Sequence, residues 1–303
     1  MNFTLQQLII FHNLVETKSV TITAERLHLT QPAVSIQLKN FQKTFDQQLF
    51  ETIGKKIYIT PFGKEIDEKI QDLILNADNI NQLTKTQSGQ LQGPLKIAVV
   101  STGKYVMPYF LSDFLSKHPM VELKMDVSNK QQVIQSLKNN EVDFALVSIV
   151  PNELNLNKID LIDNKLYMIG QTKIKHKKNP KNISACSPLI YREVGSGTRQ
   201  TMEKFIERKK IQPIKPLELT SNEAVKQAIL SGMGYSIMPI IGIKNELNNH
   251  QLEIIPIPGL PIRTVWRLVW LSEKKLSFLA EQYLNHVKKH RVEIITKHFS
   301  WLD

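Results

Sequence analysis

Residues 23–45 read TAERLHLTQPAVSIQLKNFQKTF, and this stretch decides the architecture of the N-terminal part of the chain. Apolar side chains recur at helical spacing on both sides of a break at residues 28–29: Ala24, Leu27, Val34, Leu38, Phe41 and Phe45. This pattern predicts two short helices packed across a tight turn. Thr30 stands where an N-cap belongs, and Pro32 falls in the first turn of the second helix, where its missing N–H costs nothing.

The second helix carries a polar face opposite its apolar residues. Gln31 and Ser35 stand near its start, and Lys39 follows one turn later. Amide and hydroxyl side chains at the start of a helix suit base edges in the major groove of DNA, and a lysine suits a phosphate. The alternative for the same spacing is an αα-hairpin in an ordinary helical bundle.

A hairpin is predicted after the helix pair. Residues 49–60, LFETIGKKIYIT, indicate two short strands around a Gly-Lys-Lys turn, which is the shape of the wing in a winged helix. Lys55 and Lys56 at its tip are candidates for contact with the phosphate backbone. A solvated turn without a partner is the alternative.

Several residue types agree at fixed offsets with the LysR-type transcriptional regulators. The agreement lies in LQQL at residues 5–8, AERLHLTQPAVS at 24–35, LFE at 49–51 and ITPFG at 59–63. The chain therefore resembles this family densely over roughly its first sixty residues and more loosely over its whole length. The family usually has Arg at the position of Thr52 and often at that of Ile36, so neither residue is assigned a DNA contact.

The residue pattern and the resemblance together predict one set of DNA-binding residues. These are Thr30, Gln31, Pro32, Ser35, Lys39, Lys55 and Lys56. Net charge adds little to this prediction: residues 1–90 hold 9 Lys or Arg and 9 Asp or Glu, so residues 91–303, with 30 and 19, carry all of the net +11. The local placement of lysines is therefore more informative than the isoelectric point.

Length and composition indicate an ordinary globular protein of two or three domains, with 303 residues, 42% of them hydrophobic and 22% charged. The single Cys186 excludes an internal disulfide framework and fits a reducing compartment. The first residues lack the features of a secretion signal, and no apolar run approaches the ~18 residues of a membrane span. We expect a cytoplasmic protein with no membrane partner.

A long helix is predicted over residues 62–88. Its apolar residues step by three or four: Phe62, Ile66, Ile70, Leu73, Ala77, Ile80 and Leu83. A narrow seam sustained for about three heptads needs a partner. Packing against its own domain is one alternative, and the resemblance implies a linker helix that pairs with a second copy. We expect a homodimer or homotetramer, whose recognition helices occupy separate half-sites on duplex DNA.

Two glycines and a proline in residues 88–94 predict a domain boundary. Strands are then predicted at 95–100, 121–127, 143–150, 166–170, 189–192, 217–220, 235–238 and 264–271, and helices at 105–117, 130–139, 198–209, 222–231 and 274–290. Near-continuous apolar strands separated by helices predict a parallel sheet covered on both faces.

The predicted fold class is α plus α/β. An N-terminal winged helix-turn-helix (residues 1–61) and a long linker and dimerisation helix (62–89) precede an effector-binding domain (90–303). That domain is expected to be a two-lobed, periplasmic-binding-protein-like α/β module, which the resemblance also implies. Lobe I is expected at about 91–164 and 268–303, and lobe II at about 165–267.

The ligand of this module is expected at the carboxyl ends of strands and against helix N-termini. Hydroxyls, bare amides and positive helix ends gather in three turns and suit an anion. The predicted effector-binding residues are Ser101, Thr102, Gly103, Lys104, Ser148, Gly195, Ser196, Gly197, Thr198 and Asn222. Each turn alone also fits an ordinary capped helix, but matching positions line the effector cleft of the family. Lys104, Arg192 and Arg199 favour a small anionic metabolite.

A shorter resemblance points to one branch of the family. The run Ser101-Thr102-Gly103-Lys104-Tyr105 and the pair His118-Pro119 are similar to the carbon-fixation regulators. Target genes do not follow from so short a match.

No pattern indicates catalysis, a cofactor or a metal. Gly195-Ser196-Gly197 lacks the spacing of a nucleophile elbow. His286 and His290 stand one turn apart, but no Glu follows His286, which favours a surface helix over a metal site.

We therefore expect a DNA-binding transcription regulator that is not an enzyme. Its expected partners are duplex operator DNA, a small-molecule effector, further copies of itself and, if it activates, RNA polymerase. Two alternatives stay open from the residues alone. One is a metabolite-binding or enzymatic α/β protein whose N-terminal helices only dimerise it, and the other is a nucleoid-type binder without an effector.

Overall fold

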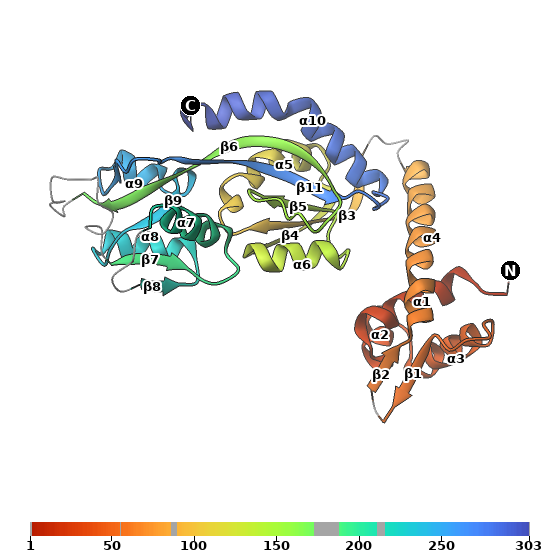
Figure 1. The fold of residues 1–303 in the computed structure, drawn as a ribbon. Coiled ribbons are helices and arrows are strands. Elements are labelled where there is room, and N and C mark those ends of the chain that lie inside the picture. The colour runs from red at the N-terminus through yellow and green to blue at the C-terminus, as the bar shows by residue number, and fades with distance from the viewer. Residues whose placement is uncertain (1, 55, 86–89, 173–187, 211–215, 303) are drawn as a thin grey trace. The chain divides into compact units, whose positions relative to one another are not determined.

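The computed structural model describes residues 2–54, 56–85, 90–172, 188–210 and 216–302. The chain folds into two compact units, Met1–Gly89 and Gln90–Asp303 (Figure 1). Lys55 and Cys186 lie outside the described residues, as does the side chain of Leu83.

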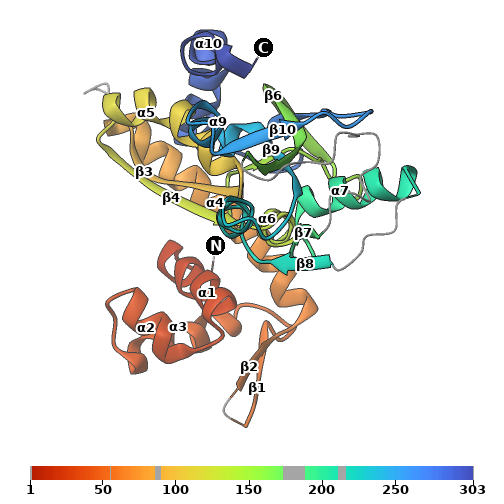
Figure 2. The ribbon, with the colours of Figure 1, turned by 90° about the vertical axis from the view of Figure 1, so that its left-hand side faces the viewer.

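The first unit is a small helical body with a hairpin and a long final helix. Its elements are α1 (Leu5–Thr17), α2 (Val20–Arg26), α3 (Gln31–Gln42), β1 (Phe50–Ile53), β2 (Lys56–Ile59) and α4 (Pro61–Lys85). Val34, Leu38 and Phe41 of α3 are buried in one core with Phe11 and Leu14 of α1. The predicted helix pair and hairpin are confirmed, and Figure 2 shows the hairpin projecting from the helical body.

The apolar seam of α4 is divided between two environments. At its start, a Cβ on Gly63 would lie 2.0 Å from the backbone oxygen of Leu49, so the junction with the hairpin requires glycine. Ile70 is buried in the core of the first unit, whereas Leu73 and Ile80 are 48% and 63% exposed. The seam therefore packs on its own unit near the hairpin and leaves apolar side chains exposed further along.

The second unit alternates strands and helices. In order, it contains β3 (Gln92–Val100), η2 (Gly103–Tyr105), α5 (Met107–Lys117), β4 (Met120–Ser128), α6 (Lys130–Lys138), β5 (Phe144–Val147), β6 (Leu156–Gln171), β7 (Leu189–Arg192), α7 (Gly197–Arg208), β8 (Pro216–Leu219), α8 (Asn222–Leu230), β9 (Ser236–Pro239), η4 (Ile240–Gly242), α9 (Lys244–Asn248), β10 (Leu252–Ile255), β11 (Ile262–Leu271), α10 (Phe278–Phe299) and η5 (Ser300–Leu302). The helices predicted beyond residue 90 are all present. The last of them starts later than predicted, after a cap at Ser277, and continues nine residues further than His290.

The main sheet is mixed, with strand order β10-β6-β11-β5-β3-β4 and β9 paired to β6. β3 is parallel to β4 and β5, but β6 runs antiparallel to β9, β10 and β11, and β11 runs antiparallel to β5. The prediction of a parallel sheet is therefore wrong for β6 and β11. β11 comes from near the end of the chain and is inserted between β5 and β6, and it runs opposite to both. β6 therefore has no parallel neighbour, although it points in the same direction as β5.

β6 and β11 link two lobes. Residues Leu156–Leu166 of β6 pair with β11, and the remainder of β6 pairs with β9 and β10. Sequence analysis missed β10, α9 and the first half of β6, because the polar residues of Leu156–Lys165 interrupt a simple apolar run. β6 runs without a break through the expected lobe boundary at residues 164–165.

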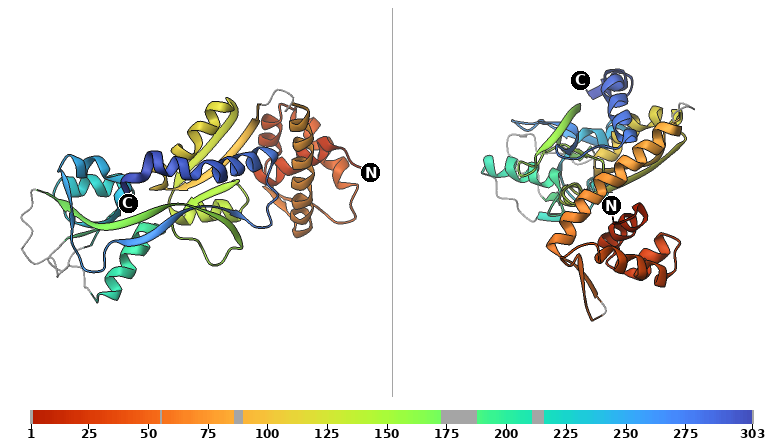
Figure 3. Two further views of the ribbon diagram at one scale, coloured as in Figure 1. Left: turned by 90° about the horizontal axis from the view of Figure 1, so that it is seen from above. Right: turned by 90° about the vertical axis from the view of Figure 1, so that its right-hand side faces the viewer.

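Helices cover both faces of lobe I. α5 and α10 pack together on one face, where Phe114 contacts Tyr283 edge to face, and α6 packs on the other. In Figure 3 (left) the dark-blue α10 runs along the green strand β6. Lobe II repeats this plan around the parallel pair β7 and β8. Leu189 and Tyr191 belong to the core under α7, and Ile190 between them belongs to the core under α8, as strand alternation requires.

The predicted domain boundary at residues 88–94 extends into a strand. Gln92, Gly93 and Pro94 pair with β4 as the first residues of β3. Among the described residues, β5 pairs with β3 only at Ile97–Val99. No strand pairs with residue 94 on that side of β3, so the missing N–H of Pro94 costs no hydrogen bond of the sheet.

Within the described residues, no helix is long and apolar enough to cross a bilayer.

Candidate functional site

The start of α3 is capped as predicted. Thr30 has extended backbone angles (φ −80°, ψ 146°), and its Oγ1 accepts a hydrogen bond from the Ala33 amide at 3.4 Å. Pro32 lies in the first turn. The cap fixes where the helix begins, and hence which side chains its first turns present.

The polar side chains of α3 share one exposed face. Gln31, Pro32, Ser35 and Lys39 are all exposed, and the opposite side of the helix is buried in the core of the first unit. The arrangement places two hydrogen-bonding side chains within the first two turns and a cation one turn further. This is the order of groups that reads base edges and then holds a phosphate.

The hairpin β1–β2 has the geometry expected of a wing. Its strands pair in register from Phe50 with Ile59 to Ile53 with Lys56. Gly54 at the turn has φ +63°, a conformation that favours glycine. Lys56 is exposed beside this turn, so of the two predicted wing lysines it is the one whose position the structure describes.

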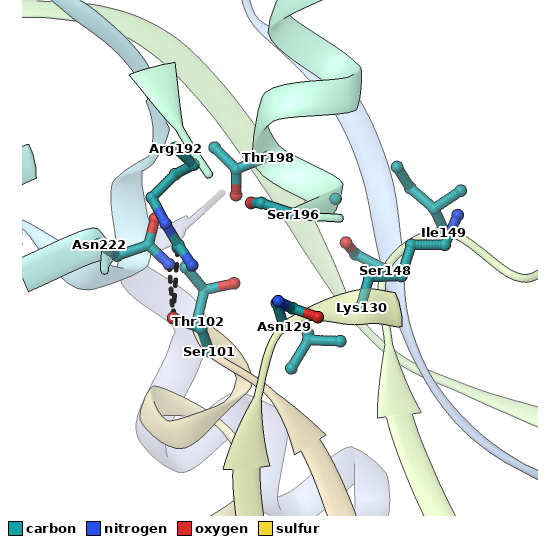
Figure 4. Close-up of a pocket in the computed structure, with 12 residues that line it drawn as sticks. Ser101, Thr102, Asn129, Lys130, Ser148, Ile149, Arg192, Ser196, Thr198 and Asn222 are labelled. Atoms are coloured by element: carbon teal, nitrogen blue, oxygen red, sulfur yellow. Dashed lines mark hydrogen bonds between the residues drawn. The ribbon is translucent and has the colours of Figure 1, made fainter. Parts of the chain in front are cut away.

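A pocket lies between the two lobes of the second unit (Figure 4). The predicted effector residues that line it are Ser101, Thr102, Ser148, Ser196, Gly197, Thr198 and Asn222. Arg192, which sequence analysis named as a cation that favours an anion, lines it too, and the lining residues that sequence analysis did not name are Val100, Asn129, Lys130 and Ile149. Residues far apart in the sequence thus form one site.

Three helix N-termini meet at this pocket. Asn129 caps α6, with its Oδ1 accepting from the Gln132 amide at 3.0 Å, and Ser196 caps α7 through the Arg199 amide at 3.4 Å. α8 begins at Asn222. Helix N-termini carry unsatisfied N–H groups and partial positive charge, which favour an anion. Asn129 was recognisable from sequence, since it follows a strand and caps a helix as Ser196 does.

The two lobes are hydrogen-bonded to each other inside the pocket. Ser101 Oγ accepts from Asn222 Nδ2 at 2.9 Å and from Arg192 Nη1 at 3.3 Å (Figure 4). The Arg192 side chain is 3% exposed and donates two further hydrogen bonds to the Glu193 carboxylate, both at 2.7 Å. Glu193 therefore balances much of the charge of Arg192.

Lys130 lines both this pocket and the adjoining one, to which Gln200 belongs. Its Nζ donates to Gln200 Oε1 of the other lobe at 3.1 Å. Burial lowers the pKa of Lys130, with a smaller opposing effect from Glu153. Since Arg192 is paired with a carboxylate, the preference of this site for an anion rests mainly on Lys130 and the helix N-termini.

Four residues expected near the ligand are placed elsewhere. Gly103 packs on the sheet, where an added Cβ would lie 2.6 Å from Val99 Cγ1. Lys104 lies with its Nζ 5.1 Å from the centroid of the Tyr105 ring and lines a different pocket. Gly195 lines an adjoining pocket.

Arg199, the fourth, is occupied by carboxylates. Its Nε lies 2.6 Å from Glu203 Oε1, and its Nη1 pairs with Glu218. These hydrogen bonds raise the pKa of Arg199. The structure therefore supports neither Lys104 nor Arg199 as a source of charge for the inter-lobe pocket.

His286 and His290 of α10 lie ring to ring in a tilted arrangement. The rings of His286 and His290 are 4.7 Å apart, and His286 Nε2 lies 3.6 Å from Asp113 Oδ2. Across the part of the chain that the structure describes, no group of three or more His, Cys, Asp or Glu side chains can hold a metal ion.

Two family matches cover the two units. Residues 5–64 match the family described as bacterial regulatory helix-turn-helix protein, lysR family, and residues 88–291 match the LysR substrate binding domain. The chain is 32% identical over 292 residues to the HTH-type transcriptional activator CmpR of Synechocystis sp., covering 95% of this chain and 96% of that protein. It is also 32% identical over 282 residues to the RuBisCO operon transcriptional regulator of Allochromatium vinosum, covering 91% and 93%.

Solved structures agree with this relationship. The CcmR regulatory domain of Synechocystis PCC6803 in complex with 2-PG is 34% identical, with a TM-score of 0.61, and covers 69% of this chain and 99% of that chain. A full-length OxyR variant of Pseudomonas aeruginosa has the same fold, with a TM-score of 0.71 at 19% identity and coverage of 97% and 95%. This chain therefore belongs to the LysR family of DNA-binding transcription regulators, in the branch of the carbon-fixation regulators.

Proposed function

We propose that this chain is a cytoplasmic regulator that binds operator DNA through α3 and the wing, and that a small phosphorylated acid bound between the lobes modulates this binding. The observation that carries the proposal is the pocket in which three helix N-termini and Lys130 converge from both lobes. A phosphate or carboxylate placed there accepts hydrogen bonds from free amides and from a cation.

The relative with 34% identity was solved with 2-PG, which is 2-phosphoglycolate. A ligand of this class has two anionic ends joined by a short link. It matches a pocket that has helix N-termini on opposite walls. Ser101 accepts two hydrogen bonds across the lobes, which leaves its hydroxyl proton to donate to an anion.

We further propose that the protein acts as a dimer or a dimer of dimers. The exposed apolar residues Leu73 and Ile80 on α4 supply a surface that a second copy covers. A ligand that contacts both lobes stabilises one lobe arrangement over others, and its effect on DNA binding is limited to that difference in affinity.

Calorimetric titration of the full chain with 2-phosphoglycolate tests the effector. Lys130→Gln should lower the affinity at least about tenfold, because a hydrogen bond to a charged group contributes about 1.5–3 kcal/mol. Lys104→Gln is the matched control, since Lys104 does not line this pocket, and should bind as the native chain does. No binding heat, or equal losses in both variants, would refute the site.

A further inference from the structure

Ile36 is an apolar residue in the middle of the polar face of α3. Its side chain is 59% exposed. At about 100° per residue, Ile36 stands almost opposite the buried Val34, Leu38 and Phe41. Isolated exposed apolar residues are ordinary on protein surfaces. Ile36 differs from such residues in that it lies among the predicted DNA-binding residues. It follows Ser35 and is about one turn from both Pro32 and Lys39.

The position of Ile36 along the helix places it among the residues that reach base edges. It is the sixth residue of α3, and recognition helices contact bases through their N-terminal half. An isoleucine side chain neither donates nor accepts a hydrogen bond. Opposite a polar base edge it would displace water without replacing the lost hydrogen bonds, which is unfavourable.

Thymine is the base that presents an apolar group in the major groove, its C5 methyl. We propose that Ile36 is a specificity-determining residue that selects thymine by packing on this methyl group. The inference rests on the proposed binding of operator DNA by α3. Burial of one methyl group corresponds to about a fourfold gain in affinity, so Ile36 discriminates modestly beside the hydrogen bonds of Gln31 and Ser35.

The experiment begins with selection of duplexes from a random library by the full chain. Each thymine of the selected half-site is then replaced by uracil, which removes the methyl group and leaves the hydrogen-bonding groups in place. One uracil position should weaken binding of the native chain about fourfold. The same replacement should have no effect on Ile36→Ala and should retain its effect on Ile36→Val.

Two further variants sharpen the test. Ile22→Ala removes an apolar side chain of similar exposure from α2 and should keep the uracil penalty. Ile36→Arg should change the preferred base at the same position to guanine, because Arg bonds to the O6 and N7 of guanine.

The outcomes separate the inference from the function on which it rests. Failure to enrich any sequence would overturn operator binding itself. Enrichment with no penalty at any uracil, or with a penalty that persists in Ile36→Ala, would overturn the role of Ile36 and leave operator binding intact.

Discussion

The DNA-binding face and the inter-lobe pocket are built in opposite ways. The face consists of exposed side chains on one helix, namely Gln31, Pro32, Ser35 and Lys39. The pocket consists of buried or half-buried side chains from distant segments, among them Ser101, Arg192 and Asn222, which hydrogen-bond to one another. Substitutions on the face should therefore change recognition with little effect on folding. Substitutions in the pocket should change both.

The largest difference is expected for Arg192→Met. The buried Arg192 is bonded to Glu193 and Ser101, so its loss leaves a carboxylate without its partner and should lower the free energy of unfolding by about 3–5 kcal/mol. Arg26→Met is the matched change in the first unit, because Arg26 forms an exposed ion pair with Glu16. It should cost at most about 1 kcal/mol.

Urea unfolding of the full chain measures both values. The unfolding transition of the second unit is measured for Arg192→Met, and that of the first unit for Arg26→Met. Equal costs for Arg192→Met and Arg26→Met would show that the bonds of the buried Arg192 are no stronger than a surface pair, and would remove the contrast drawn above.

Gln31→Ala should lower the affinity for the selected operator by about 1–3 kcal/mol and leave binding to random DNA almost unchanged, because it removes a base contact. Lys56→Ala should weaken binding to both DNAs and reduce the slope of affinity against salt concentration, because it removes a phosphate contact. Fluorescence anisotropy at several salt concentrations separates the two effects. Identical behaviour of the two variants would contradict the division of roles between α3 and the wing.

The two N-caps offer a matched pair with a smaller effect. Thr30 Oγ1 and Ser196 Oγ each accept from an amide three residues on at 3.4 Å, so alanine at either should cost about 1 kcal/mol of stability. Ser196→Ala should also weaken binding of 2-phosphoglycolate, since Ser196 lines the pocket. Thr30→Ala should leave the affinity for 2-phosphoglycolate unchanged. A loss equal to that of Ser196→Ala would mean that a change in the first unit alters ligand binding in the second.

The smallest effect is a pH dependence. Because burial lowers the pKa of Lys130, its ammonium loses its proton at a lower pH than an exposed lysine does. The affinity for 2-phosphoglycolate should therefore fall as the pH is raised from about 8 to about 10, a range in which the phosphate keeps its charge. Calorimetry on Lys130→Gln should give a flat profile there. A parallel decline in that variant would assign the effect to another group.

Sequence analysis predicted the elements whose signals are local. The apolar spacing of Val34, Leu38 and Phe41 and the capping residue Thr30 act within a few turns of one helix, so α3 is correct in place and in exposed face. The strand-to-helix turns at Ser101, Ser196 and Asn222 are local signals of the same kind, and the structure brings all three to one pocket.

The errors come from partners that are distant in sequence. The direction of β11 depends on its pairing with β6, whose partner residues lie about a hundred positions away. Arg199 follows directly after the predicted ligand-binding turn, but its guanidinium forms an ion pair with Glu218 of the next strand. Lys104 is the exception, because its ammonium lies near the ring of its neighbour Tyr105. No pattern of spacing reports where such a long side chain ends once the chain has folded.

The long strand β6 has a mechanical consequence. It passes through both lobes as 16 continuous residues and is laddered to the ten residues of β11. A change in the angle between the lobes must bend this two-stranded ribbon. Because the two strands are hydrogen-bonded to each other, such bending costs more free energy than rotation about a flexible linker would. The register of the ribbon shifts between Trp266 and Arg267, and such irregularities bend a strand locally. A ligand that changes this angle must therefore supply the free energy that bending the ribbon costs.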